Sequence, residues 1–155
     1  GYGWIEFEPT AAEPVLARPV SQSGTTGDRS ESRNPPRPQP EWEDRIDMAL
    51  TFKELGVDSV PINFLMPTKG NPLENYGLIK EEDALRIIAI FRIILKDKTI
   101  RIAAGRESVF TKKQELIFEA GANGIMIGSY LTKEGAPIES DKRLMEKVEE
   151  KWKTE

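Results

Sequence analysis

The stretch Thr99-Ile-Arg-Ile-Ala-Ala-Gly-Arg-Glu107 decides how the rest of the sequence is interpreted. Its isoleucines, Ile100 and Ile102, alternate with Arg101 and a small residue, which predicts a short strand with two different faces. Strands that lie between helices are normally apolar on both faces, so an arginine needs a special environment. Two interpretations are open. Arg101 faces the interior of a parallel α/β barrel, where a charge needs a partner, a metal or water, or it faces solvent from an edge strand.

Helical and extended patterns alternate on both sides of this stretch. The predicted helices cover 41–55, 81–95, Thr111 to Gly121 and the segment after Ser140 or Asp141, and the other two predicted strands cover 59–65 and 124–128. This order with short connections is typical of βα units on a parallel sheet. In each strand the β-branched residues share one face, whereas Asn63, Arg101 and the Gly124/Gly128 pair take the other. A packed barrel interior prefers branched aliphatic residues, so polar and small residues there indicate a lumen that holds a ligand.

The first forty residues have a different character. Residues 1–10 alternate aromatic residues with glycines and acids, which predicts an isolated strand-like segment that closes at Pro9. Residues 11–40 are rich in Pro, Ser and Gly and have no hydrophobic period, which predicts a disordered linker. A solvated tether is favoured over a recognition motif at Arg33 to Pro40. Residues 41–155 form the predicted folded unit.

The composition excludes several classes of function. The 155 residues contain no Cys and no His, so the chain offers no thiolate nucleophile, no Cys-ligated cluster and no imidazole base. A net charge of −4 gives no electrostatic basis for nucleic-acid binding. No apolar run has the length of a membrane span, and no secretory signal opens the chain, so no membrane partner is expected.

Four motifs in order carry a resemblance. They are Val60-Pro-Ile-Asn-Phe-Leu65, Lys69-Gly-Asn-Pro-Leu-Glu-Asn75, Ile100-Arg-Ile-Ala-Ala-Gly-Arg-Glu107 and Ala120-Gly-Ala-Asn-Gly-Ile-Met-Ile-Gly128. Together they resemble the C-terminal part of the biotin synthase family, also called the biotin and thiamin synthesis associated region. The likeness runs from about Trp42 to Leu144, roughly two thirds of the chain.

The resemblance implies a fold, a chemistry and two site residues. The family comprises radical S-adenosylmethionine (SAM) enzymes on a (β/α)₈ TIM-type barrel that insert sulfur into dethiobiotin, using a [4Fe–4S] cluster on three cysteines and a [2Fe–2S] cluster as sulfur source. Arg101 matches the family's unusual arginine ligand of the [2Fe–2S] cluster, and Asn63 matches an asparagine that contacts dethiobiotin. Arg106 and Glu107 match the motif beyond the strand, where an ion pair that fixes the loop is expected. A cytoplasmic location is implied as well.

The departures from the family are equally clear. The cluster cysteines and the first barrel strands have no counterpart, and Pro38-Gln-Pro40 stands where a cofactor-contacting glycine-rich turn is expected. What remains corresponds to a partial barrel of about three parallel strands, which is expected to be inactive alone, to hold no catalytic residue and to bind neither SAM nor a cluster by itself. An alternative is a non-catalytic fragment that forms a homo-oligomer or complements another barrel fragment. Another is a remnant of a transglutaminase-like protein, because residues 1–10 resemble the closing strand of that domain with Glu8 as its triad acid.

Overall fold

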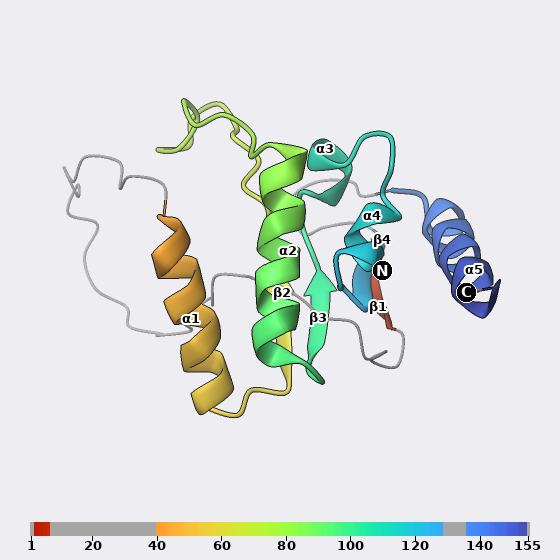
Figure 1. Ribbon diagram of the computed structural model, residues 1–155. Coiled ribbons are helices and arrows are strands. Elements are labelled where there is room, and N and C mark those ends of the chain that lie inside the picture. The colour runs from red at the N-terminus through yellow and green to blue at the C-terminus, as the bar shows by residue number, and fades with distance from the viewer. Residues whose placement is uncertain (1, 7–39, 129–135, 155) are drawn as a thin grey trace.

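The computed structural model describes residues 2–6, 40–128 and 136–154 (Figure 1). The elements in chain order are β1 (Tyr2–Glu6), α1 (Trp42–Glu54), β2 (Ser59–Ile62), α2 (Glu81–Leu95), β3 (Thr99–Ile102), α3 (Arg106–Val109), α4 (Leu116–Glu119), β4 (Gly124–Gly128) and α5 (Ile138–Thr154). The predicted linker over 11–40 lies outside the described residues apart from Pro40, and so does Glu8. None of the described helices has the length and apolar character needed to span a bilayer.

The strands form one mixed sheet in the order β1-β4-β3-β2. β2, β3 and β4 are parallel, as the alternation of helices and strands predicts, and Pro61, Arg101 and Gly124 are neighbours across them. β1 is not the isolated segment that was expected, because it pairs antiparallel with β4. The outer edge of β4 would otherwise present unpaired N–H and C=O groups, and pairing with β1 satisfies them. The protein is therefore an α/β domain with a four-stranded sheet.

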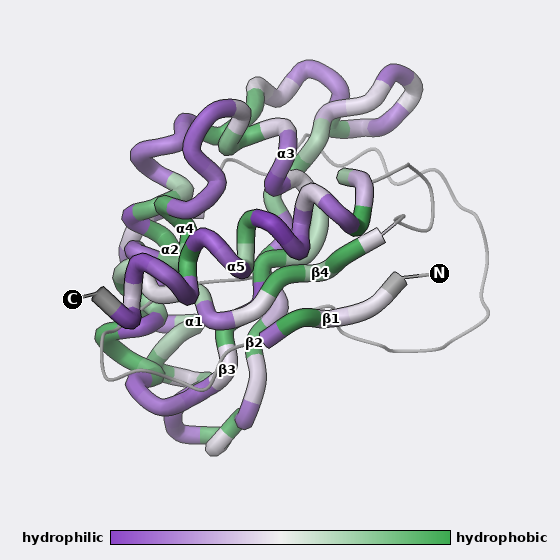
Figure 2. Tube along the Cα trace, turned by 90° about the vertical axis from the view of Figure 1, so that its right-hand side faces the viewer, coloured by the Kyte–Doolittle hydropathy of each residue, from purple (hydrophilic) through white to green (hydrophobic). Residues whose placement is uncertain are grey.

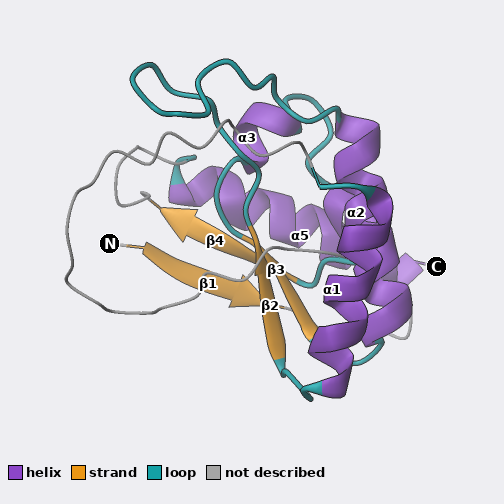
Figure 3. Ribbon diagram, turned by 90° about the vertical axis from the view of Figure 1, so that its left-hand side faces the viewer, coloured by secondary structure: helices purple, strands orange, loops and turns teal. Residues whose placement is uncertain are grey.

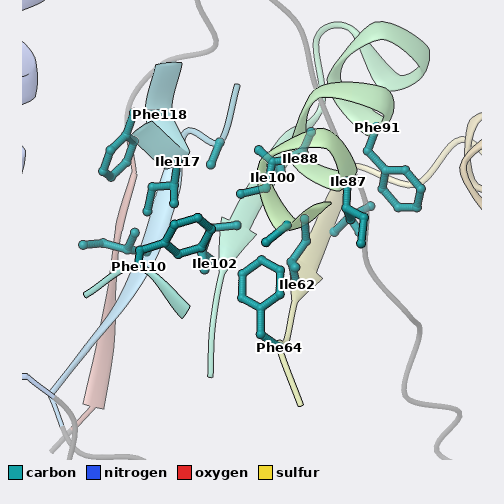
Figure 4. Packing of buried hydrophobic residues seen from close by; sticks show 14 of the residues in the cluster. Ile62, Phe64, Ile87, Ile88, Phe91, Ile100, Ile102, Phe110, Ile117 and Phe118 are labelled. Carbon is teal, nitrogen blue, oxygen red and sulfur yellow. The ribbon is translucent and has the colours of Figure 1, made fainter. Parts of the chain in front are cut away.

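The helices cover one face of this sheet. In Figure 3, α1 and α2 stand beside β2 and β3, and α5 lies behind β4; buried residues of all three helices belong to one core cluster with the strands. The side chains of Ile62, Ile100 and Ile102 are buried there against Ile88 and Phe91 of α2 (Figure 4). Burying each such side chain is worth about 1.5–3 kcal/mol, so this layer is the main source of stability. Figure 2 shows that β4 is mostly hydrophobic, whereas α5, which lies beside it, is mostly hydrophilic.

Some element ends agree with the sequence patterns and others do not. α2 covers the predicted 81–95, with acidic residues in its first turn that suit the positive end of the helix. α4 begins at Leu116 and not at Thr111, because the Gln114 side chain, which would close a capping box, accepts a hydrogen bond from Arg106 instead. α5 begins at Ile138, directly after Pro137, whose carbonyl accepts from the Ser140 N–H at 2.8 Å.

β2 is shorter than predicted, since its ladder ends at Ile62 and not at Leu65. The alternation of burial nevertheless continues as expected: Phe64 is buried, whereas Asn63 and Leu65 are exposed. The Phe64 N–H donates to the Ala104 carbonyl at 2.9 Å, so the chain still follows β3 at this point. The face assignment made from the sequence therefore holds beyond the end of the regular strand.

Candidate functional face of the sheet

The face of the sheet opposite α1 and α2 carries the two residues singled out by the sequence. Arg101 points away from its buried neighbours Ile100 and Ile102, and its cross-strand neighbours are Pro61 and Gly124. Asn63 follows Pro61 by two residues on the same exposed side. The Asn63 Oδ1 accepts a hydrogen bond from the Ala104 N–H at 3.1 Å, which holds the amide beside the end of β3. We call this surface, formed by Pro61, Asn63, Leu65, Arg101 and Gly124, the open face.

The Arg101 side chain contacts two residues of β1. Its Nε forms an ion pair with the Glu6 carboxylate of β1, and its guanidinium lies over the Trp4 ring at 5.0 Å from the centroid. The Arg101 side chain is 29% exposed and that of Glu6 is 35% exposed, so the pair is only partly shielded from water. Cation–π contacts of this kind add to the attraction of the carboxylate. The charge on the strand thus has an acidic and an aromatic partner from the N-terminal strand.

Gly124 leaves the space in which these side chains meet. A Cβ at this position would lie 3.0 Å from the Glu6 Cγ and 3.2 Å from the Arg101 Cγ, which is tighter than ordinary van der Waals contact. A larger residue would therefore separate the two charges or push β1 outward. Since Glu6 is the cross-strand partner of Gly124, the pairing register itself delivers the carboxylate to Arg101.

Sequence reasoning did not identify Trp4 and Glu6 as partners of Arg101. The signal that could have found them is their even spacing in residues 2–6, which places an aromatic ring and an acid on one face of a strand. Nothing local links that strand to β4. Glu8, the acid that the transglutaminase likeness singled out, lies outside the described residues.

Beyond β3, the predicted ion pair of Arg106 and Glu107 is present at 3.2 Å, but it is not the main contact. Arg106 is fully buried and donates to Asp141 of α5 at 2.7 Å. Its other amino group donates to the Gln114 side-chain oxygen. Burial raises the pKa of Asp141 above its ordinary value, and the charge of Arg106 opposes that shift. This cluster ties α3 to α5 and is a structural clamp.

Arg92 is a second buried arginine with a structural role. It donates to the carbonyls of Gly121, Lys96 and Lys98 at 2.8, 2.7 and 2.6 Å, and to the Asn123 side chain at 3.0 Å. The first three acceptors lie in the turns that follow α2 and α4, so the guanidinium satisfies backbone carbonyl groups near the ends of both helices. The interruption of the apolar face of α2 by a charge is thereby explained.

The residues available for iron do not form a ligand set. The chain has no Cys or His, and no group of three or more acidic side chains in the described segments is placed to hold a metal ion. Iron–sulfur clusters are held mainly by thiolates, and Arg101 is paired with Glu6. These residues therefore do not fit either cluster by themselves. The open face offers an amide and a guanidinium, which bind polar and anionic groups.

Comparison with known proteins identifies relatives of this chain. Residues 61–150, more than half of the chain, match the family model described as the biotin and thiamin synthesis associated domain. The chain is similar to proteins named biotin synthase from Crocosphaera subtropica (46% identity over 69% of this chain and 28% of the relative) and Thermotoga neapolitana (47%, 70% and 39%). It is also similar to one from Endomicrobium trichonymphae (49%, 66% and 32%). The chain thus spans only 28–39% of the length of these three relatives. No solved structure matches it.

Proposed function

The chain belongs to the biotin and thiamin synthesis associated domain family, and from this premise we propose that its folded part is the C-terminal wall of a biotin synthase-like barrel. In this proposal β2, β3 and β4 are three of the eight strands of a radical SAM (β/α)₈ barrel, and the open face looks into the lumen. One observation carries the proposal: three parallel strands have helices on one face, and the polar side chains of Arg101 and Asn63 lie on the other. Barrels of this type place helices outside and ligands inside the strands.

Asn63 is the proposed contact for dethiobiotin. Its Oδ1 is engaged by the Ala104 N–H, which leaves the NH₂ group of the amide as a donor toward the open face. A hydrogen-bonding group fixed by the backbone suits the positioning of a small polar substrate. Arg101 is the proposed residue that faces the [2Fe–2S] cluster in the assembled enzyme. Because this chain supplies no cysteine, another segment or chain must provide the thiolate ligands of both clusters. The binding of SAM, which supplies the radical chemistry, would depend on that same part.

The second candidate function is a self-associating or complementing fragment. In the described sheet β2 has a strand neighbour on one side only, and Leu65 is exposed on the open face. An uncovered edge can pair with a further strand, and an uncovered face with an exposed apolar residue can pack against another surface. This candidate and the barrel proposal rely on the same two surfaces, because a completed barrel would cover both the edge of β2 and the open face.

A complementation assay tests the proposal. The chain is mixed with a polypeptide that carries the cysteine-bearing N-terminal part of a biotin synthase, and the mixture is reconstituted with iron and sulfide. Conversion of dethiobiotin to biotin with SAM and a reductant is then measured, together with the visible absorbance of the clusters. We expect turnover from the mixture and from neither component alone. Cluster absorbance or reductive SAM cleavage by this chain alone would contradict the proposal, and so would a mixture that forms no complex.

Within the active mixture, Asn63→Ala tests the substrate contact. Loss of one hydrogen bond to the substrate should lower activity about tenfold, which corresponds to the upper range for a neutral hydrogen bond. Asn75→Ala, at an exposed asparagine of the loop before α2, is the matched control and should leave activity unchanged. Equal effects of the two substitutions would remove Asn63 from the proposed site.

A further inference from the structure

β1 occupies the edge of β4 through a complete five-residue register, from Tyr2 opposite Gly128 to Glu6 opposite Gly124. It runs antiparallel to a strand whose other neighbour is parallel. β1 therefore covers the place where a further parallel strand would pair with β4. Figure 3 shows β1 beside β4, and the strand order places β2 at the other edge of the sheet, where it has no described strand on its outer side.

The same strand also takes the charge of the open face. Glu6 is ion-paired with Arg101, Trp4 lies against its guanidinium, and Gly124 provides the gap in which the three side chains meet. These contacts depend on one register, because a shift of one residue along β4 would turn Trp4 and Glu6 to the other face of the sheet. The pairing of β1 with β4 in this register is therefore what brings Glu6 and Trp4 to Arg101.

We propose that β1 is a detachable strand. While it is docked, it prevents other partners from binding Arg101 and from pairing with the edge of β4. While β1 is docked, an anion or carboxylate that reaches the open face must displace Glu6 before it can bind Arg101, and a further strand must displace β1 before it can pair with β4. Detachment of β1 makes the guanidinium and the edge available at the same time. The inference rests on the contacts of β1 and not on the proposed barrel, so it stands or fails separately.

Four features make detachment easier than unfolding of the domain. β1 is short, its residues from Gly3 to Glu6 are at least partly exposed, and it has no described strand on its outer side. Residues 7 to 41 connect it to α1, and fixing the ends of so long a connection opposes docking. Edge elements with these properties open locally at a lower free energy than the core.

Amide hydrogen exchange followed by NMR can detect detachment within the intact chain. The Asn123 N–H donates to the Ile100 carbonyl of β3 at 3.0 Å. Because N–H groups alternate along a strand, the Ile125 amide also faces β3, whereas the Gly124 and Met126 amides face β1. The Gly124 and Met126 amides therefore report on β1, and the Ile125 amide is an internal control for opening of the parallel sheet.

The test compares Glu6→Gln with Glu54→Gln, a control at an exposed glutamate at the end of α1. Loss of a partly exposed ion pair should speed exchange at Gly124 and Met126 about two- to fivefold and leave Ile125 unchanged. Titration with acetate should then shift the Arg101 Nε–H resonance in Glu6→Gln at concentrations that leave the unsubstituted chain unaffected. The charge-exchanged pair Glu6→Arg with Arg101→Glu should restore slow exchange at Gly124 and Met126.

Three results would overturn the inference. The first is unchanged exchange at Gly124 and Met126 in Glu6→Gln. The second is an equal rise at Met126 and Ile125, which would mean that β1 opens only with the whole sheet. The third is an acetate response of Arg101 that is the same with and without the Glu6 carboxylate.

Discussion

At the scale of single residues, the ion pair of Arg106 with Asp141 is the contact on which stability should depend most. Both side chains are almost completely buried, and the distance from the Arg106 Nη2 to the Asp141 Oδ1 is 2.7 Å. Removing one partner of a buried pair leaves an uncompensated charge and typically costs about 3–5 kcal/mol. We therefore expect Arg106→Met to lower the free energy of unfolding by about this amount in urea titrations.

Arg86→Met provides the matched control for that substitution. The Arg86 side chain is 61% exposed and forms its ion pair with Asp83 at 3.2 Å, so it should lose less than about 1 kcal/mol. Replacing both members of the buried pair, as in Arg106→Met with Asp141→Leu, should cost less than the sum of the two single losses. Similar losses for Arg106→Met and Arg86→Met would contradict the assignment of a buried clamp.

The same pair gives stability a pH dependence with a definite sign. Burial raises the pKa of Asp141 in the folded state above its ordinary value of 3.8, despite the nearby Arg106. The folded state therefore holds its proton at pH values where the unfolded state has lost it, and stability falls as the pH rises through this window. The free energy of unfolding of the chain, relative to Asp141→Asn, should decrease from about pH 4 toward neutral pH.

The Asn variant isolates this effect because other carboxylates cancel in the difference. Glu115 acts in the opposite direction, since the hydrogen bond from Lys147 lowers its pKa and its contribution is lost as the pH falls. Denaturant unfolding of both proteins at several pH values measures the difference. If this difference in the free energy of unfolding increased toward neutral pH, the attraction of Arg106 for the Asp141 carboxylate would outweigh the cost of burying it.

Sequence alone identified the unusual residues more readily than their partners. Arg101 was conspicuous because a charge interrupts an apolar alternation, and the local pair of Arg106 with Glu107 follows from adjacency. Glu6 pairs with Arg101 and Asp141 pairs with Arg106, but both acids lie far from their arginines in the sequence. Attraction between two charges leaves no local pattern, so neither contact could be predicted without the fold.

At the scale of elements, the turn from β3 into α3 depends on Gly105. Its φ of +87° lies in the left-handed region, and an added Cβ would lie 2.4 Å from the Phe64 carbonyl oxygen. Gly56, after α1, has a φ of +65° with nothing within 4 Å of an added Cβ. Both alanine variants should lose about 1–2 kcal/mol from the backbone conformation, and Gly105→Ala should lose a further 1–3 kcal/mol or so from the clash.

Thermal or urea unfolding of the two alanine variants measures that difference directly. Gly56→Ala serves as the control because it shares the backbone conformation and lacks the close approach. Equal losses would mean that β2 and α3 can move apart without cost. Such a result would also weaken the placement of Asn63 beside the end of β3.

The element patterns succeeded where neighbouring residues decide the outcome. α2 has acids in its first turn and a wide apolar face, and its predicted ends are correct. The helix does not begin at Thr111 as predicted, because the Gln114 side chain accepts a hydrogen bond from the buried Arg106 and does not cap the helix. Tertiary contacts override a capping motif whenever a buried charge would otherwise lack a partner.

At the scale of the whole molecule, the parallel order of β2, β3 and β4 followed from the alternation of helices and strands, but β1 did not. Parallel strands need crossover helices, and these are visible in sequence as helical periods between strand patterns. β1 joins the sheet across a connection with no such pattern. The alternation in residues 1–10 predicted a strand, and only the fold shows that β4 is its neighbour.

The open face leads to the final prediction, which concerns association. In the described part of the chain no helix lies on this face, and Leu65 is 38% exposed there. Apolar surface beside an unpaired strand edge favours association. Light scattering during gel filtration at tens of micromolar should therefore give a mass above the 17.5 kDa of the monomer.

Leu65→Lys should shift this assembly toward the monomer, because a charge on the open face would have to be desolvated at the contact. Leu55→Lys is the matched control, since Leu55 is 72% exposed at the end of α1, away from the open face. If both variants keep the mass of the unsubstituted chain, association does not use the open face. A monomeric unsubstituted chain with a cooperative thermal transition would instead mean that four strands and one helical layer suffice as a domain.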